Sequence, residues 1–170
     1  EVKILFIIRD VFAQSASLKR HVEKQGEKGW AFQFSEDPKH CWSMTQNPGT
    51  TVSSDLSMEA YTLMWLRLNK LALGELSRLD SSQYHVISYE ALVKDQQATL
   101  KDTFDFLRLK QKYSKAEEKI RAEKSNIYNT TTSGDLLTKW QEQLTEAEVD
   151  SIKEVLKTHQ SDFDYIKSFL

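Results

Sequence analysis

The chain opens with Glu1-Val-Lys-Ile-Leu-Phe-Ile-Ile-Arg-Asp-Val-Phe-Ala-Gln-Ser-Ala-Ser17, and the rest of the predicted architecture follows from this stretch. The run from Val2 to Ile8 is apolar and rich in β-branched residues, which predicts a strand buried on both faces of a parallel sheet. The run stops at Arg9, and Asp10 is placed to cap a helix that continues to about Gly26. The opening unit is therefore a strand that leads into a helix.

The junction between this strand and this helix is a candidate anion site. In open α/β sheets, ligands bind beyond the carboxyl ends of the strands, where helix N-termini offer unpaired N–H groups. Arg9 stands at that edge, and its guanidinium can hold a phosphate through two parallel hydrogen bonds. Ser17, two helical turns further on, can add a hydroxyl to the same anion. A structural ion pair or a helix cap would use the same residue types.

A second strand also ends in polar residues. Residues 84–88, Tyr-His-Val-Ile-Ser, have the composition of a strand, and Tyr89 and Glu90 end it. Asp95 is then placed to cap a helix that carries Leu100, Phe104 and Leu107. Two strands are therefore predicted to deliver polar pairs to one edge of the sheet.

The two segments, in this order, resemble the nucleotide-binding elements of the sulfotransferase superfamily. Arg9, Asp10 and Ser17 are similar to its 3′-phosphate segment, in which an Arg closes a strand and a Ser lies on the following helix. The strings Tyr89-Glu90-Ala91-Leu92 and Phe106-Leu107-Arg108-Leu109 look like the family's Tyr-Glu-Asp-Leu and Phe-Leu-Gly-Leu. This chain departs from the family at Val11, where Pro is common, and at Ala91 and Arg108.

This resemblance implies an α/β fold with a P-loop-like parallel sheet and flanking helices, incomplete in this chain and mostly helical. It also implies that Arg9 and Ser17 hold the 3′-phosphate of 3′-phosphoadenosine 5′-phosphosulfate and that Tyr89 packs beside its adenine. The sulfuryl group would pass, with no metal, to a hydroxyl of a carbohydrate-like acceptor such as a glycan. Trp65 and Asn69 form a pair that also recurs in sulfotransferases, although a packing role is expected for Trp65.

The family's Gly-rich loop with Lys-Ser or Lys-Thr, which holds the 5′-phosphosulfate, has no counterpart in the sequence. In sulfotransferases that loop precedes the strand with which this chain begins. The resemblance therefore implies that residues 1–170 form a sulfotransferase-like domain without this N-terminal loop, with the catalytic residues upstream. We expect the chain alone not to transfer sulfate, and any leader or membrane anchor to lie outside it.

Two other functions fit the same residues. One is a non-catalytic module of sulfotransferase ancestry that binds a nucleotide or a partner. The other is a P-loop kinase-like fragment, although the Mg²⁺ ligands and Arg-rich lid of such kinases do not stand out here.

Composition limits the remaining options. A net charge of −2 and a pI near 6.1 argue against broad binding of nucleic acid, while a local site for one nucleotide stays compatible with them. The single cysteine, Cys41, excludes an internal disulfide and a cysteine-rich zinc site. The four histidines show no metal-ligand spacing, so no metal site is predicted. The length suits one domain with one core.

The other segments complete the predicted layout. Residues 27–51 are rich in aromatic side chains, and we expect them to form an ordered segment that lies over the sheet edge or a substrate cleft. A long helix is expected over 54–79, with an apolar stripe of Leu56, Ala60, Leu63, Met64, Leu68, Leu71 and Leu76. A charged surface helix is expected over 110–124. Thr145 and Glu148 form a capping box before a final amphipathic helix, and residues 163–170 are expected to close over the core.

Two features bear on the branch of the family and on the compartment. Cytosolic sulfotransferases carry an Arg-Lys-Gly phosphate loop before the Trp that corresponds to Trp140, whereas residues 131–135 of this chain contain no basic residue. The resemblance therefore favours the carbohydrate-modifying or bacterial branches. Asn129-Thr-Thr131 is an acceptor triplet for N-glycosylation, which favours the Golgi lumen over the cytoplasm.

Overall fold

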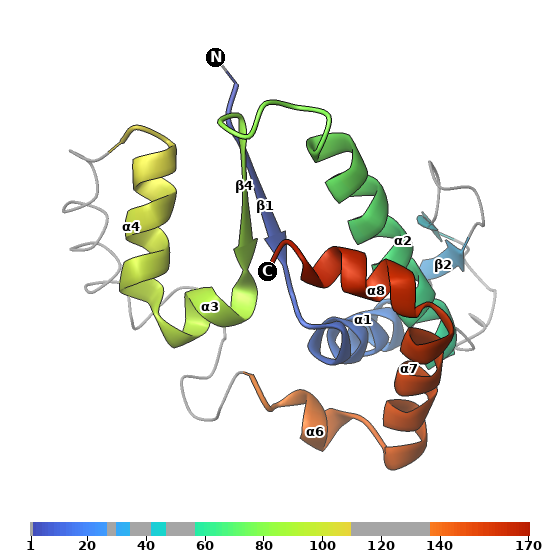
Figure 1. The fold of residues 1–170 in the computed structure, drawn as a ribbon. Coiled ribbons are helices and arrows are strands. Elements are labelled where there is room, and N and C mark those ends of the chain that lie inside the picture. Colours follow the sequence, from blue (N-terminus) through green and yellow to red (C-terminus); the bar gives the residue numbers. More distant parts are fainter. Residues whose placement is uncertain (1, 27–29, 35–41, 47–56, 110–136) are drawn as a thin grey trace.

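Two parallel strands form the centre of the computed structural model, which describes residues 2–26, 30–34, 42–46, 57–109 and 137–170. β1 (Ile4–Ile8) pairs with β4 (Tyr84–Ser88), in a register that runs from Ile4 opposite Tyr84 to Ile8 opposite Ser88. Figure 1 shows α4 on one side of this pair and α2 with α8 on the other. The predicted α/β character, mostly helical with few strands, is confirmed at this level.

The larger core lies on the side of the sheet that faces α2. It joins α1 (Val11–Gly26), α2 (Met58–Leu76), α7 (Glu146–Thr158) and α8 (Gln160–Lys167). The side chains of Ile8, Leu73, Ile152 and Ile166 are at most 1% exposed within it. The short helix α6 (Trp140–Gln143) closes the end near α1, where the ring of Trp140 stacks on Phe12 at 4.8 Å. The C-terminal segment therefore covers the core as predicted.

A smaller layer covers the other side. The strand β4 leads directly into α3 (Tyr89–Lys94), and α4 (Gln96–Phe106) then packs back against β4. The rings of His85 and Phe106 stack at 5.3 Å and join α4 to the strand. The start of α3 at Tyr89 confirms that this residue ends the strand.

A β-hairpin lies between the first two long helices. β2 (Trp30–Phe34) and β3 (Trp42–Gln46) are antiparallel, with Trp30 opposite Gln46 and Phe34 opposite Trp42. The sequence predicted order in this region but not a hairpin, because its turn residues do not form one of the short two-residue signals.

The predicted helix caps are confirmed. Asp10 Oδ1 accepts hydrogen bonds from the backbone N–H groups of Phe12 and Ala13, at 3.0 and 3.1 Å. Asp95 Oδ1 accepts from the N–H of Ala98 at 3.0 Å. Thr145 and Glu148 exchange the two hydrogen bonds of a capping box at the start of α7. Side-chain caps thus set the beginnings of α1, α4 and α7.

The prediction that the first strand is buried on both faces is wrong. The side chains of Leu5 and Ile7 are 39% and 52% exposed, whereas Ile8 on the opposite face is 1% exposed. Within the described residues β1 has a strand neighbour on one side only, and α4 packs on β4. The face that carries Leu5 and Ile7 therefore lacks a covering layer in the described part of the chain.

The predicted apolar stripe of the long helix is only partly confirmed: Leu76 is buried and Leu63 packs against the core, whereas Leu71 is exposed and Leu56 lies outside the described residues. The buried residues of α2 are Met58, Tyr61, Thr62, Trp65, Leu66, Leu73 and Leu76, and Leu71 is 42% exposed. The helix packs against α1, α7 and α8 at once, so it buries a broad face. That face also carries aromatic residues and Thr62, which a pattern of aliphatic residues does not include. The Thr62 hydroxyl donates a hydrogen bond to the Met58 carbonyl at 2.7 Å.

Several predictions lie outside the described residues. They are the helix over 110–124, the stretch 131–135, the acceptor Asn129 and Cys41. Among the helices that are described, none combines the length and the apolar character that a membrane crossing requires.

Candidate functional site

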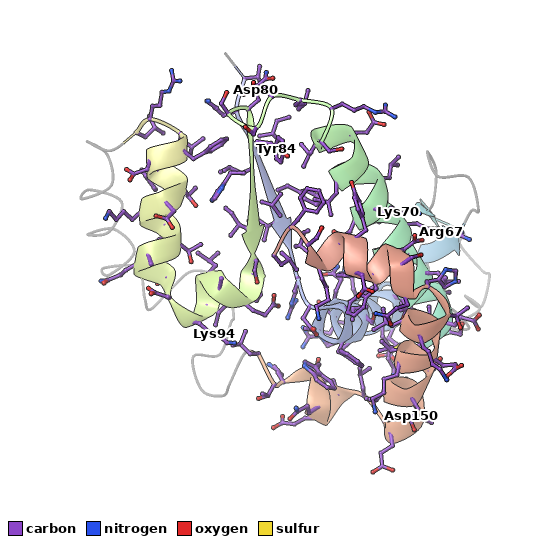
Figure 2. All side chains as sticks on the ribbon, in the orientation of Figure 1. Arg67, Lys70, Asp80, Tyr84, Lys94 and Asp150 are labelled. Carbon is purple, nitrogen blue, oxygen red and sulfur yellow. The ribbon has the colours of Figure 1, made fainter. Side chains whose placement is uncertain are left out.

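The strand register brings two of the predicted site residues together. Ile8 and Ser88 form the last pair of the parallel ladder, so Arg9 and Tyr89 are the next residues at the same end of the sheet. The guanidinium carbon of Arg9 lies 4.9 Å from the centre of the Tyr89 ring, within cation–π range. Figure 2 labels Asp80 and Tyr84 near the opposite end of β4, and Lys94 on α3 beyond the end that carries Arg9.

Among the described residues, the Arg9 guanidinium has no ion-pair partner within bonding distance, although its charge interacts with that of the neighbouring Asp10 carboxylate. Its Nε is buried and makes no hydrogen bond, and within the described residues no carboxylate oxygen lies in ion-pair range of the guanidinium. A buried donor without a partner is unfavourable, and an ionised one more so. A bound anion would satisfy this group, so the end of β1 has the chemistry of an anion site.

The backbone of Arg9 is held by two other elements. The indole Nε1–H of Trp65, on α2, donates to the Arg9 carbonyl oxygen at 2.9 Å. The backbone N–H of Asp10 donates to Glu90 Oε1, on α3, at 2.9 Å. The other carboxylate oxygen of Glu90 accepts from the Ser88 hydroxyl at 3.1 Å. Glu90 therefore connects the ends of β1 and β4.

Asp10 occupies the N-terminus of α1 that an anion was expected to use. Burial raises the pKa of its carboxyl and the nearby Glu90 carboxylate raises it further, whereas the hydrogen bonds from Ala13 and Phe12 and the charge of Arg9 lower it. Because Asp10 already accepts those two N–H groups, an anion at this edge would depend on the Arg9 side chain more than on the helix end.

Ser17, the third predicted site residue, makes no direct contact with the other two among the described residues. It lies half-buried on α1, and in the described part of the chain no hydrogen bond joins it to Arg9 or Tyr89. Of the predicted site, Arg9 and the adenine-side residue Tyr89 lie in contact, and Ser17, the second residue of the predicted phosphate clamp, lies on the adjoining helix α1.

A cleft opens beside Arg9, between β1, α1 and α2. Its volume is about 330 Å³, and the polar side chains that line it include those of Arg9, Gln14, Tyr61 and Asn69. The rest of the wall is mostly apolar, with side chains that include Phe6, Leu18, Met64 and Trp65. Asn69 is fixed by a hydrogen bond from its Nδ2 to the Trp65 carbonyl at 2.7 Å. Arg9 therefore lines this cleft and also contacts the Tyr89 ring.

Sequence reasoning missed the role of Glu90 and underestimated that of Trp65. Glu90 was read only as a residue that ends a strand, and Trp65 as a packing residue. Trp65 is indeed 6% exposed, but its indole N–H also binds the residue predicted to hold phosphate. The signals that could have identified them are the Tyr-Glu string and the spacing of Trp65 and Asn69.

Comparisons with family models, with curated proteins and with solved structures found no match for this chain. In the described ranges, no group of three His, Cys, Asp or Glu side chains is placed to bind a metal ion. The function of the chain is therefore inferred from the geometry of the site and from the sequence resemblance.

Proposed function

We propose that this chain supplies the 3′-phosphate and adenine side of the nucleotide site of a sulfotransferase. The donor would be 3′-phosphoadenosine 5′-phosphosulfate, and the acceptor a hydroxyl of a carbohydrate-like molecule. The observation that carries the proposal is the Arg9 guanidinium, which has a buried Nε without a partner and lies 4.9 Å from the Tyr89 ring. The resemblance to the 3′-phosphate and Tyr-Glu segments of the family supports the same assignment.

In this proposal each residue has a separate task. Arg9 binds the 3′-phosphate through charge-assisted hydrogen bonds, which are the stronger kind because the donor is ionised. Tyr89 offers an aromatic face to the adenine. Ser17, on α1, would add a hydroxyl donor to the same phosphate. Sulfuryl transfer itself would depend on groups that hold the 5′-phosphosulfate and accept the proton of the acceptor.

The test is calorimetric titration with adenosine 3′,5′-bisphosphate. Arg9→Ala should weaken binding by about 1.5–3 kcal/mol, the usual contribution of a hydrogen bond to a charged group. Arg20→Ala is the matched control, because Arg20 is an exposed arginine on α1, the helix that follows Arg9. Unchanged affinity in Arg9→Ala, or an equal loss in Arg20→Ala, would count against the proposal.

A further inference from the structure

The Arg9–Asp10 peptide group is held at both of its polar atoms by side chains from elsewhere in the chain. Its C=O accepts from the Trp65 indole at 2.9 Å, and its N–H donates to Glu90 at 2.9 Å. We infer that Trp65 and Glu90 are positioning residues that orient this peptide plane and thereby direct the Arg9 side chain toward Tyr89. The inference concerns Arg9 as the phosphate ligand and so rests on the proposed function.

Peptide planarity gives the two contacts a joint effect. The carbonyl of Arg9 and the N–H of Asp10 belong to one rigid plane, so contacts at both ends restrict the Arg9 ψ and the Asp10 φ angles. The direction of the Arg9 Cα–Cβ bond follows from the same backbone. Fixing the plane therefore limits where the guanidinium can lie.

Each of the two holding side chains is itself braced. Trp65 is 6% exposed, and its ring lies 6.2 Å from that of Phe163 on α8. Glu90 also accepts from the hydroxyl of Ser88, which in turn accepts from the Ala91 N–H at 3.3 Å. A side chain locked by its own neighbours transmits orientation better than a freely rotating one.

Glu90 also links the two halves of the site. It directly follows Tyr89, and it binds the residue that directly follows Arg9, 80 positions away in the sequence. A carboxylate close to an anion site repels the ligand, so its charge is unfavourable there. Glu90 instead accepts two hydrogen bonds, and a neutral side chain with an acceptor oxygen could accept them as well. If Glu90 acts by position, its effect therefore depends on these hydrogen bonds and not on its charge.

The neutral variant separates these roles. Glu90→Gln keeps an oxygen that can accept from the Asp10 N–H, whereas Glu90→Ala removes it. If Glu90 acts by position, Glu90→Gln should bind adenosine 3′,5′-bisphosphate as well as the wild type or better, and Glu90→Ala should bind it about three- to tenfold more weakly. Trp65→Phe, which lacks the N–H donor, should show a loss of similar size. Trp140→Phe is the control for a tryptophan that packs on α1 without binding Arg9.

A double-mutant cycle decides whether the effect passes through Arg9. In an Arg9→Ala background, Glu90→Ala and Trp65→Phe should cause no further loss of affinity. Full additivity of the losses, or variants that lower the melting temperature while binding the bisphosphate normally, would overturn the inference. A binding loss in Glu90→Gln equal to that in Glu90→Ala would overturn it as well.

A second readout needs no nucleotide. The Tyr89 ring should shift the NMR signals of the Arg9 δ and ε protons upfield, and these can be assigned by comparison with Arg9→Lys. The shift should persist in Glu90→Gln and shrink in Glu90→Ala and Trp65→Phe. If the wild type fails to bind the bisphosphate but these shifts change as stated, the proposed function fails and the positioning role stands. If the shifts stay the same in every variant, the positioning role is refuted.

Discussion

The guanidinium carbon of Arg9 lies 4.9 Å from the centre of the Tyr89 ring, although β1, which ends just before Arg9, and β4, which ends just before Tyr89, are separated in the sequence by α1, a hairpin and α2. The contact exists because β1 and β4 are parallel neighbours whose last ladder pair is Ile8 and Ser88. A positive group and an aromatic face therefore lie side by side at one sheet edge. In the proposed function, the positive group binds the 3′-phosphate and the aromatic face packs on the adenine.

The aromatic face should contribute to nucleotide affinity. Tyr89→Leu removes the ring, and we expect it to weaken binding of adenosine 3′,5′-bisphosphate by about 0.5–1.5 kcal/mol. Tyr89→Phe keeps the ring and should lose less. Calorimetry on both variants measures the difference, and a larger loss in Tyr89→Phe than in Tyr89→Leu would contradict a stacking role.

Asp10 should make the stability of the protein depend on pH. Burial and the Glu90 carboxylate raise the pKa of Asp10 above 3.8 in the folded state, so the folded chain binds its proton more tightly than the unfolded chain does. The free energy of unfolding therefore falls as the pH rises from 3.8 through the raised value. Asp10→Asn removes this titration and keeps a good N-cap.

Urea unfolding at a series of pH values checks this expectation. The free energy of unfolding of Asp10→Asn, minus that of the wild type, should increase with pH across the window and then level off. Asp95→Asn, at the cap of α4, provides a second N-cap substitution for comparison. A difference that decreases with rising pH would show that the carboxylate is stabilised by folding instead.

Arg108 should be a site where glycine stabilises the fold. It has a φ of 58° and follows the last residues of α4, where the Leu109 N–H binds the Phe104 carbonyl and the Arg108 N–H binds that of Asp105. This is a Schellman motif, whose left-handed position favours glycine. Arg108→Gly should raise the free energy of unfolding by about 0.5–1 kcal/mol relative to Arg108→Ala, which retains a Cβ. Equal stabilities in thermal unfolding would argue against the left-handed conformation.

The C-terminal helix should be essential to the core. Ile166 on α8 is 0% exposed, whereas Leu170 in the same segment is 56% exposed. Ile166→Ala should lower the free energy of unfolding by about 2–5 kcal/mol through lost burial and a residual cavity. Leu170→Ala should change it little. Comparable effects of the two substitutions in urea unfolding would mean that α8 does not dock as described.

The sequence predicted most of the local structure because local signals controlled it. Asp10, Asp95 and Thr145 with Glu148 mark helix starts through contacts within a few residues of each. The strand over residues 84–88 was predicted with its observed bounds, because β-branched residues and a following polar pair delimit it.

The errors concern contacts that are distant in the sequence. The exposure of Leu5 and Ile7 depends on which layers surround β1, and the buried face of α2 depends on the three helices that meet it. The same limit applies to the site. Arg9 and Tyr89 could be selected from strand ends, but the bonds from Trp65 and to Glu90 connect elements whose relative placement only the structure provides.

The central claim is that this sheet edge recognises a 3′-phosphate. Calorimetric titration of the wild-type chain with adenosine 3′,5′-bisphosphate and with adenosine 5′-monophosphate tests it most directly, because the two ligands differ only in that group. We expect the bisphosphate to bind more tightly by about tenfold or more, the effect of one charge-assisted contact. Equal affinities for the two nucleotides, or binding of neither, would contradict the account.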